Sequence, residues 1–215
     1  ETVDKENIQE LAITLNNLST LYYSMNNKQK AIEYGKRSLQ YREKTGDYEK
    51  LSLSCCNLSQ LYAGLDNEQA EKYRQLCVKY AEQSGNEDRV MHSYITTSVI
   101  AGSLKKFELS KEYELKAISL LEKNGRDEAM LARRYIALAI NSGYLKEDSI
   151  TTITYFNKAL KQSHALNNKY NLKDTYNYLT EFYKKHNDYQ KAFEYNSKYL
   201  LYIDSIISAN TATNI

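Results

Sequence analysis

The chain has 215 residues, with no proline, only 7 glycines and 21 tyrosines. This shortage of turn-forming residues disfavours a strand-rich fold and favours long helices. The 29 Lys and Arg residues nearly balance the 27 Asp and Glu residues, so the formal net charge of +2 gives no reason to expect nucleic-acid binding. No apolar run approaches the roughly 18 residues that a membrane-spanning helix needs, so this chain is predicted to make no membrane contact.

Polar linkers with glycine or asparagine recur along the chain at Gly46, Gly85, Gly125 and Asn167. The interval between them is about 40 residues, which is the signature of a repeat architecture. A glycine or asparagine just past a helix can adopt the left-handed conformation that ends it. In chain order these stops define five blocks, residues 8–46, 47–85, 86–125, 126–167 and 168–205, followed by a tail at 206–215.

Each block divides again at a polar hinge, and on both sides of the hinge apolar residues recur at helical spacing. Each block is therefore predicted to be a helix pair, and residues 1–205 to be a single all-α array of about five pairs. The hinges are Asn26–Asn27, Asp66–Asn67, Lys105–Lys106, Glu147–Asp148 and Asn187–Asp188.

Small residues recur in register in both helices of every block. Such side chains let neighbouring helices approach closely, and stacking covers the apolar face that one pair cannot bury alone. The first helices carry Ser19, Ser59, Ser98, Ala139 and Thr180. The second helices carry Ala31, Ala70, Ser110, Thr152 and Ala192.

These columns are part of a longer pattern of a large residue, a leucine, a small residue and a tyrosine. The first block shows it as Leu15, Leu18, Ser19, Tyr22 and Ala31, and the second as Cys55, Leu58, Ser59, Tyr62 and Ala70. The pattern resembles the tetratricopeptide repeat family, which implies an α-α superhelix, or solenoid. The period near 40 exceeds that family's usual length of about 34 residues, which implies lengthened helices.

The sequence offers no constellation that could carry chemistry. His92, His164 and His186 lie far apart, and the glycines are scattered singly, without a phosphate-binding loop or dinucleotide motif. We therefore predict no catalysis, no metal and no cofactor. The three cysteines, Cys55, Cys56 and Cys77, are interpreted as small, free, buried hydrophobic side chains.

The first helices are expected to line a concave groove for a protein or peptide partner, because the resemblance implies binding there. The middle of this groove is apolar. The alternative is that Ile95, Val99, Ile136 and Ile140 pack against each other or against the second helices. The predicted groove residues are Tyr23, Gln60, His92, Ile95, Val99, Arg133, Ile136, Ile140, Tyr144 and Asn177.

The tyrosine-rich helices and the apolar run at residues 199–206 are similar to the N-terminal arrays of bacterial membrane-tethered regulators. That resemblance implies an extracytoplasmic (periplasmic) sensor in a two-component system or transcription regulator, with a histidine kinase or DNA-binding output domain elsewhere. The chain begins without methionine and is expected to be a piece of such a protein. The alternative is a cytoplasmic assembly scaffold or a regulator that binds signalling peptides.

Overall fold

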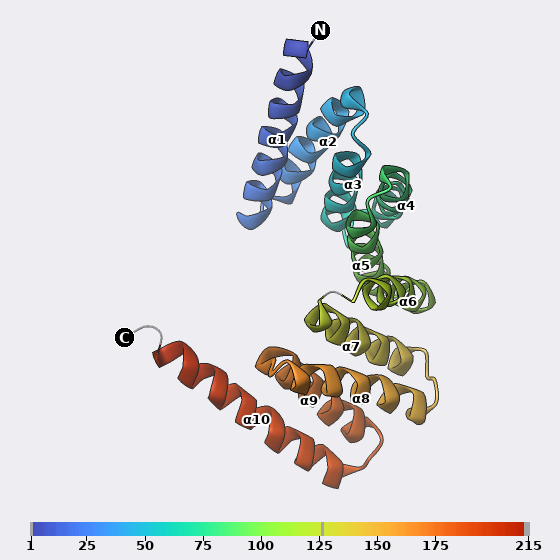
Figure 1. The fold of residues 1–215 in the computed structure, drawn as a ribbon, viewed down its shortest axis with the longest axis vertical. Helices are drawn as coiled ribbons and strands as arrows, with labels where there is room; N and C mark the ends of the chain where they lie inside the picture. Colours follow the sequence, from blue (N-terminus) through green and yellow to red (C-terminus); the bar gives the residue numbers. More distant parts are fainter. Residues whose placement is uncertain (1, 126, 213–215) are drawn as a thin grey trace. The chain divides into compact units, whose positions relative to one another are not determined.

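The computed structural model describes residues 2–125 and 127–212, which form ten α-helices and no strand (Figure 1). The all-α, tetratricopeptide-like architecture of five helix pairs is confirmed. The helices are α1 (Thr2–Ser24), α2 (Lys28–Thr45), α3 (Tyr48–Tyr62), α4 (Asn67–Ser84), α5 (Glu87–Ser103), α6 (Phe107–Asn124), α7 (Glu128–Tyr144), α8 (Ser149–Ala165), α9 (Lys169–Lys185) and α10 (Tyr189–Ala212).

The helix ends lie where the stop signals predicted them. Gly46 and Gly85 adopt left-handed conformations with φ of 69° and 68°, so each ends a second helix without the strain that a side chain would cause. The next helix then begins at a polar cap, as where the Asp47 carboxylate accepts a hydrogen bond from the Lys50 amide at 3.1 Å. The last helix differs from the prediction. It passes residue 205 and continues to Ala212, because no glycine or proline interrupts it.

The contacts of the chain group into two compact units, Glu1–Ala117 (unit 1) and Ile118–Ile215 (unit 2). The boundary lies within α6. The sequence analysis placed both in one array, residues 1–205. Each unit has its own core, and each is described by itself.

The small-residue columns are buried and join the two helices of a pair. In unit 1 the Ser59 hydroxyl donates a hydrogen bond to the carbonyl of Ala70 at 2.6 Å, and Ser19 donates to Ala31 in the same way at 2.7 Å. This geometry requires a serine-sized side chain at the first position and an alanine-sized one at the second. The columns therefore fix how closely the paired helices approach.

Replacing Ala70 by leucine should lower the free energy of unfolding by about 1–3 kcal/mol, because extra methylenes in a close-packed contact force the helices apart. Ala70 is completely buried, whereas Lys79 lies on the exposed side of the same helix. Chemical denaturation of Ala70→Leu and of the control Lys79→Leu measures the difference. Equal stability of the two variants would show that the two helices are paired in a different register.

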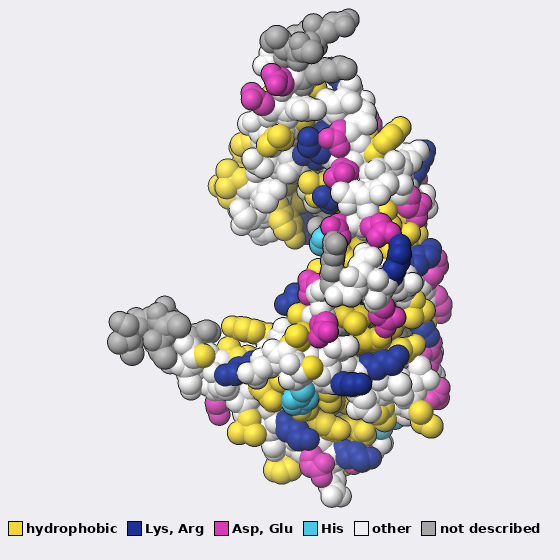
Figure 2. Space-filling model, viewed as in Figure 1, with side chains coloured by type: hydrophobic (Ala, Val, Ile, Leu, Met, Phe, Trp, Pro, Cys, Tyr) yellow, Lys and Arg dark blue, Asp and Glu magenta, His cyan; other side chains and the backbone are white. Residues whose placement is uncertain are grey.

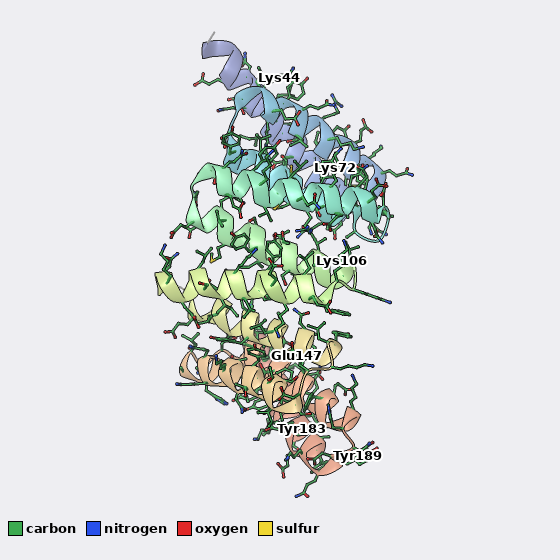
Figure 3. All side chains as sticks on the ribbon, turned by 90° about the vertical axis from the view of Figure 1, so that its right-hand side faces the viewer. Lys44, Lys72, Lys106, Glu147, Tyr183 and Tyr189 are labelled. Atoms are coloured by element: carbon green, nitrogen blue, oxygen red, sulfur yellow. A yellow bond between two sulfur atoms is a disulfide. The ribbon has the colours of Figure 1, made fainter. Side chains whose placement is uncertain are left out.

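Tyrosine rings fill much of the space between paired helices. Tyr62 of α3 stacks on Tyr73 of α4 with ring centroids 5.7 Å apart, and in unit 2 Tyr183 stacks on Tyr195 at 5.4 Å. On the exposed side lysines cover such rings, as where the ammonium group of Lys72 (labelled in Figure 3) lies 5.8 Å from the centre of the Tyr73 ring. The tyrosine content therefore serves packing, with the hydroxyl groups near water.

The cysteines correct one interpretation from the sequence. All three are buried, as predicted, but Cys56 of α3 and Cys77 of α4 are joined by a disulfide across one helix pair, so the two are not free thiols. Their Cα atoms lie 5.0 Å apart because the Ser59–Ala70 contact holds these helices together. Cys55 remains a thiol, and burial raises its pKa to about 12, which leaves it protonated and unreactive at neutral pH.

Candidate partner-binding groove

Three helices of unit 2 line an open hollow of about 320 Å³. The first helices of two successive pairs, α7 and α9, form its walls, and α8 forms its floor. This volume is in the range of sites that take a small ligand or one large side chain with its neighbours. The lining residues, here called the unit 2 groove, are Ala139, Ile140, Gly143 and Tyr144 from α7, Thr152 and Phe156 from α8, and Asn177, Tyr178, Glu181, Phe182 and Lys185 from α9.

The walls of the unit 2 groove present large apolar side chains to solvent. Tyr144 is 60% exposed on one wall and Tyr178 is exposed on the other, while Ile140 and Phe182 are half-buried beside them. Phe156 closes the floor and meets Phe182 edge to face, with ring centroids 6.3 Å apart. Packing thus holds the Phe156 and Phe182 rings in place.

A second hollow of about 260 Å³ adjoins the groove and shares Gly143, Thr152, Phe182 and Lys185 with it. It adds Lys146, Glu147 and His186, and we call it the polar end of the groove. Thr152 lies between the two hollows, and its buried hydroxyl has no hydrogen-bond partner in the described part of the chain.

The acidic groups at the groove are already engaged. The Ser142 hydroxyl donates a hydrogen bond to Glu147 at 2.6 Å (Glu147 is labelled in Figure 3), and the Lys184 ammonium group pairs with Glu181 at 2.8 Å. Within residues 2–125 and 127–212, by contrast, Lys146 and Lys185 form no ion pair. The polar end has two lysines and one carboxylate, Glu147, so its charge balance is positive, which suits an acidic group on a partner.

Three of the predicted groove residues meet at this site, namely Ile140, Tyr144 and Asn177. Two other predicted residues of α7, Arg133 and Ile136, do not line the groove. Ile136, one turn before Ile140, is only 7% exposed, so its side chain belongs to the core, as the alternative interpretation allowed. Arg133 is exposed, and its Nε donates a hydrogen bond to the Asn171 side chain at 3.2 Å, outside the groove.

The remaining predicted residues belong to unit 1. Tyr23 of α1 and Gln60 of α3 line a smaller hollow of about 130 Å³, next to the Asn57 side chain. The Asn57 amide donates to Asn16 at 3.3 Å and so bridges α1 and α3. The three residues predicted on α5 lie outside this hollow: His92 and Val99 are exposed, and Ile95 is half-buried.

Sequence reasoning identified three of the eleven residues that line the unit 2 groove. On α9 it selected Asn177, but the wall also uses Tyr178, Glu181, Phe182 and Lys185. The signal for these was present, because Tyr178 and Phe182 are large apolar residues four positions apart on one helical face. The floor residues from α8 were missed because only first helices were considered.

Neither a metal site nor a membrane span is found in the part of the chain that the structure describes. No group of three or more His, Cys, Asp or Glu side chains there could hold a metal ion. None of the described helices combines the length and apolar character needed to cross a bilayer.

Comparison with known proteins identifies the fold. No protein-family model and no curated protein matches the sequence. Among solved structures, BtubC from P. vanneervenii superposes with a TM-score of 0.81 at 21% identity, over 95% of this chain and 84% of that one. A signal transduction ATPase with a tetratricopeptide repeat sensor from Pyrococcus horikoshii gives 0.78 at 20% identity, over 96% of this chain but only 33% of that protein.

A Rap protein complexed with competence and sporulation factor gives a TM-score of 0.54 at 12% identity, over 93% of this chain and 66% of that one. At these identities the likeness establishes architecture only. The agreement extends over nearly the whole chain and is consistent with the helix pairs already described. The chain therefore has the tetratricopeptide-repeat fold.

Proposed function

We propose that this chain is the partner-binding and sensing module of a larger regulatory protein, without catalysis of its own. The observation that carries the proposal is the unit 2 groove, where exposed Tyr144 and Tyr178 flank an open hollow. Binding energy at protein interfaces is concentrated on such aromatic side chains around a desolvated centre. The groove therefore suits one apolar side chain of a protein or peptide partner.

The chemistry of the groove also defines the kind of segment that it would bind. An aliphatic or aromatic side chain would enter between Ile140 and Phe182, and an acidic residue next to it would reach Lys146 and Lys185 at the polar end. The acidic residue would add selectivity more than affinity, since charges at the rim of an interface contribute little energy.

Two of the structural neighbours support a binding role. One carries a tetratricopeptide repeat sensor in a signal transduction ATPase, and another is a Rap protein with a bound factor. We further propose that this chain senses its partner outside the cytoplasm and passes the signal to a histidine kinase or DNA-binding output. The Cys56–Cys77 disulfide supports that compartment, because such bonds persist in oxidising environments.

The Rap likeness also favours a second candidate, a cytoplasmic regulator that binds a signalling peptide or acts as an assembly scaffold. The redox state of the cysteines in cells separates the two. Alkylation of freshly lysed cells should find Cys56 and Cys77 bonded in the first case and as thiols in the second.

The binding role is tested by selecting phage-displayed random peptides on the whole chain. Enriched peptides should carry a large apolar residue beside Asp or Glu. Their affinity should fall about tenfold in Lys185→Glu, which corresponds to about 1.4 kcal/mol, and should be unchanged in the control Lys79→Glu. Failure to enrich any peptide, or enriched peptides that lack an acidic residue and ignore Lys185→Glu, would contradict the proposed partner chemistry.

A further inference from the structure

Gly143, in the last turn of α7, is a glycine that neither the backbone nor the packing requires. Four other glycines adopt positive φ, and Gly35 lies so close to α3 that a Cβ there would be only 3.0 Å from the Leu58 side chain. Gly143 is helical, and a Cβ there would meet nothing outside its own stretch of helix within 4 Å. The left-handed residue after the end of α7 is Lys146, with φ of 55°. Because glycine is a poor helix former, folding alone does not favour it at this position.

Thr152 of α8 is a second residue that lowers the stability of unit 2. It is 1% exposed, and its hydroxyl has no hydrogen-bond partner in the described part of the chain. The corresponding residues of the first two blocks are Ala31 and Ala70, which have no side-chain polar atom. A buried polar group without a partner costs free energy of folding. Local departures from the rules of stable packing are expected where a protein has a functional site.

Gly143 and Thr152 lie at one place, the junction of the unit 2 groove with its polar end. Both line both hollows, as do Phe182 and Lys185. Apolar side chains lie next to Lys and Arg side chains at several places on the face of unit 2 that Figure 2 shows, so this mixture alone does not distinguish the groove. The distinguishing feature is that no side chain projects from Gly143, where an apolar hollow meets a basic one.

We propose that Gly143 is a specificity-determining residue of the groove, because its bare backbone lets one continuous partner segment pass from the apolar hollow to the polar end. The inference rests on the function proposed above and narrows the partner chemistry. The main chain of the segment crosses Gly143, where glycine permits a close approach. Its large apolar side chain lies beside Ile140 and Phe182, and the acidic side chain of an adjoining residue reaches Lys146. A side chain at position 143 would occupy the space that the segment needs.

Alanine and leucine at position 143 test the inference with a peptide selected on the wild type. Both residues favour a helix more than glycine does, so Gly143→Ala and Gly143→Leu should melt no lower than the wild type. The affinity should nevertheless fall, by about 10- to 100-fold in Gly143→Leu and by less in Gly143→Ala, because the added atoms overlap the peptide. The matched control is Gly102→Leu, at the same repeat position on α5 of unit 1, where a Cβ would make an ordinary 3.5 Å contact with the Ser110 Oγ. It should bind the peptide like the wild type.

A second peptide, with its acidic residue replaced by the corresponding amide, provides the decisive comparison. It should bind the wild type several-fold more weakly than the acidic peptide. On Gly143→Leu the two peptides should bind equally, because the acidic side chain no longer reaches the polar end. An equal loss on both proteins, or wild-type affinity in Gly143→Leu, would overturn this inference and leave the binding role intact. A wild type that binds neither peptide would overturn the proposed function, and this inference with it.

Discussion

Reduction of the Cys56–Cys77 disulfide is expected to lower the free energy of unfolding of unit 1 by about 3 kcal/mol, because the bond restricts the unfolded chain over a loop of this length. The sequence separation is 21 residues, and the bond joins α3 to α4 within one helix pair. Urea denaturation with and without a reductant measures the effect. Cys77→Ala should show no response to the reductant, whereas Cys55→Ala, which changes the remaining buried thiol, should respond like the wild type.

The number of reactive thiols tests the same bond chemically. Unfolded without a reductant, the protein should take up one alkylating group, at Cys55, and with a reductant it should take up three. Three modified cysteines in the unreduced, unfolded protein would contradict the disulfide and remove the structural support for an oxidising compartment.

Much of the fold could be predicted because its signals are local. Gly46 and Gly85 end helices through backbone conformation alone, and Asp47 begins one through a cap that needs only its own neighbours. Each local signal recurs in every repeat. The repeats could therefore be aligned with one another, and the alignment identified the serine and alanine columns. The Cys56–Cys77 disulfide could not be predicted, because it depends on how α3 is rotated relative to α4 about the Ser59–Ala70 contact.

The groove was harder to predict because exposure depends on small rotations about a helix axis. Four residues advance an α-helix by about 400°, so side chains at this spacing drift by about 40° at each step. This drift separates Ile136, which is buried, from Ile140, which faces the groove. Periodicity alone identifies the apolar face of a helix, but not which residues at the margin of that face are exposed.

The affinity of Ile140→Asp for a peptide selected on the wild type tests the central claim most directly. Ile140 lies half-buried in the lining of the unit 2 groove, together with Tyr144 and Phe156. A carboxylate there would remove an apolar contact at the centre of the site and would also repel an acidic peptide. The matched control is Ile150→Asp, the same substitution on unit 2 outside the groove.

Calorimetric titration of both variants, together with circular dichroism, gives the comparison. The account predicts that Ile140→Asp keeps its helicity and binds the peptide at least about 100-fold more weakly, a loss of about 2.7 kcal/mol, while Ile150→Asp binds like the wild type. If Ile140→Asp unfolds, Tyr144→Ala takes its place, since that side chain is largely exposed and contributes little to the core. A folded groove variant that binds the peptide as tightly as the wild type would contradict the assignment of this groove as the binding site.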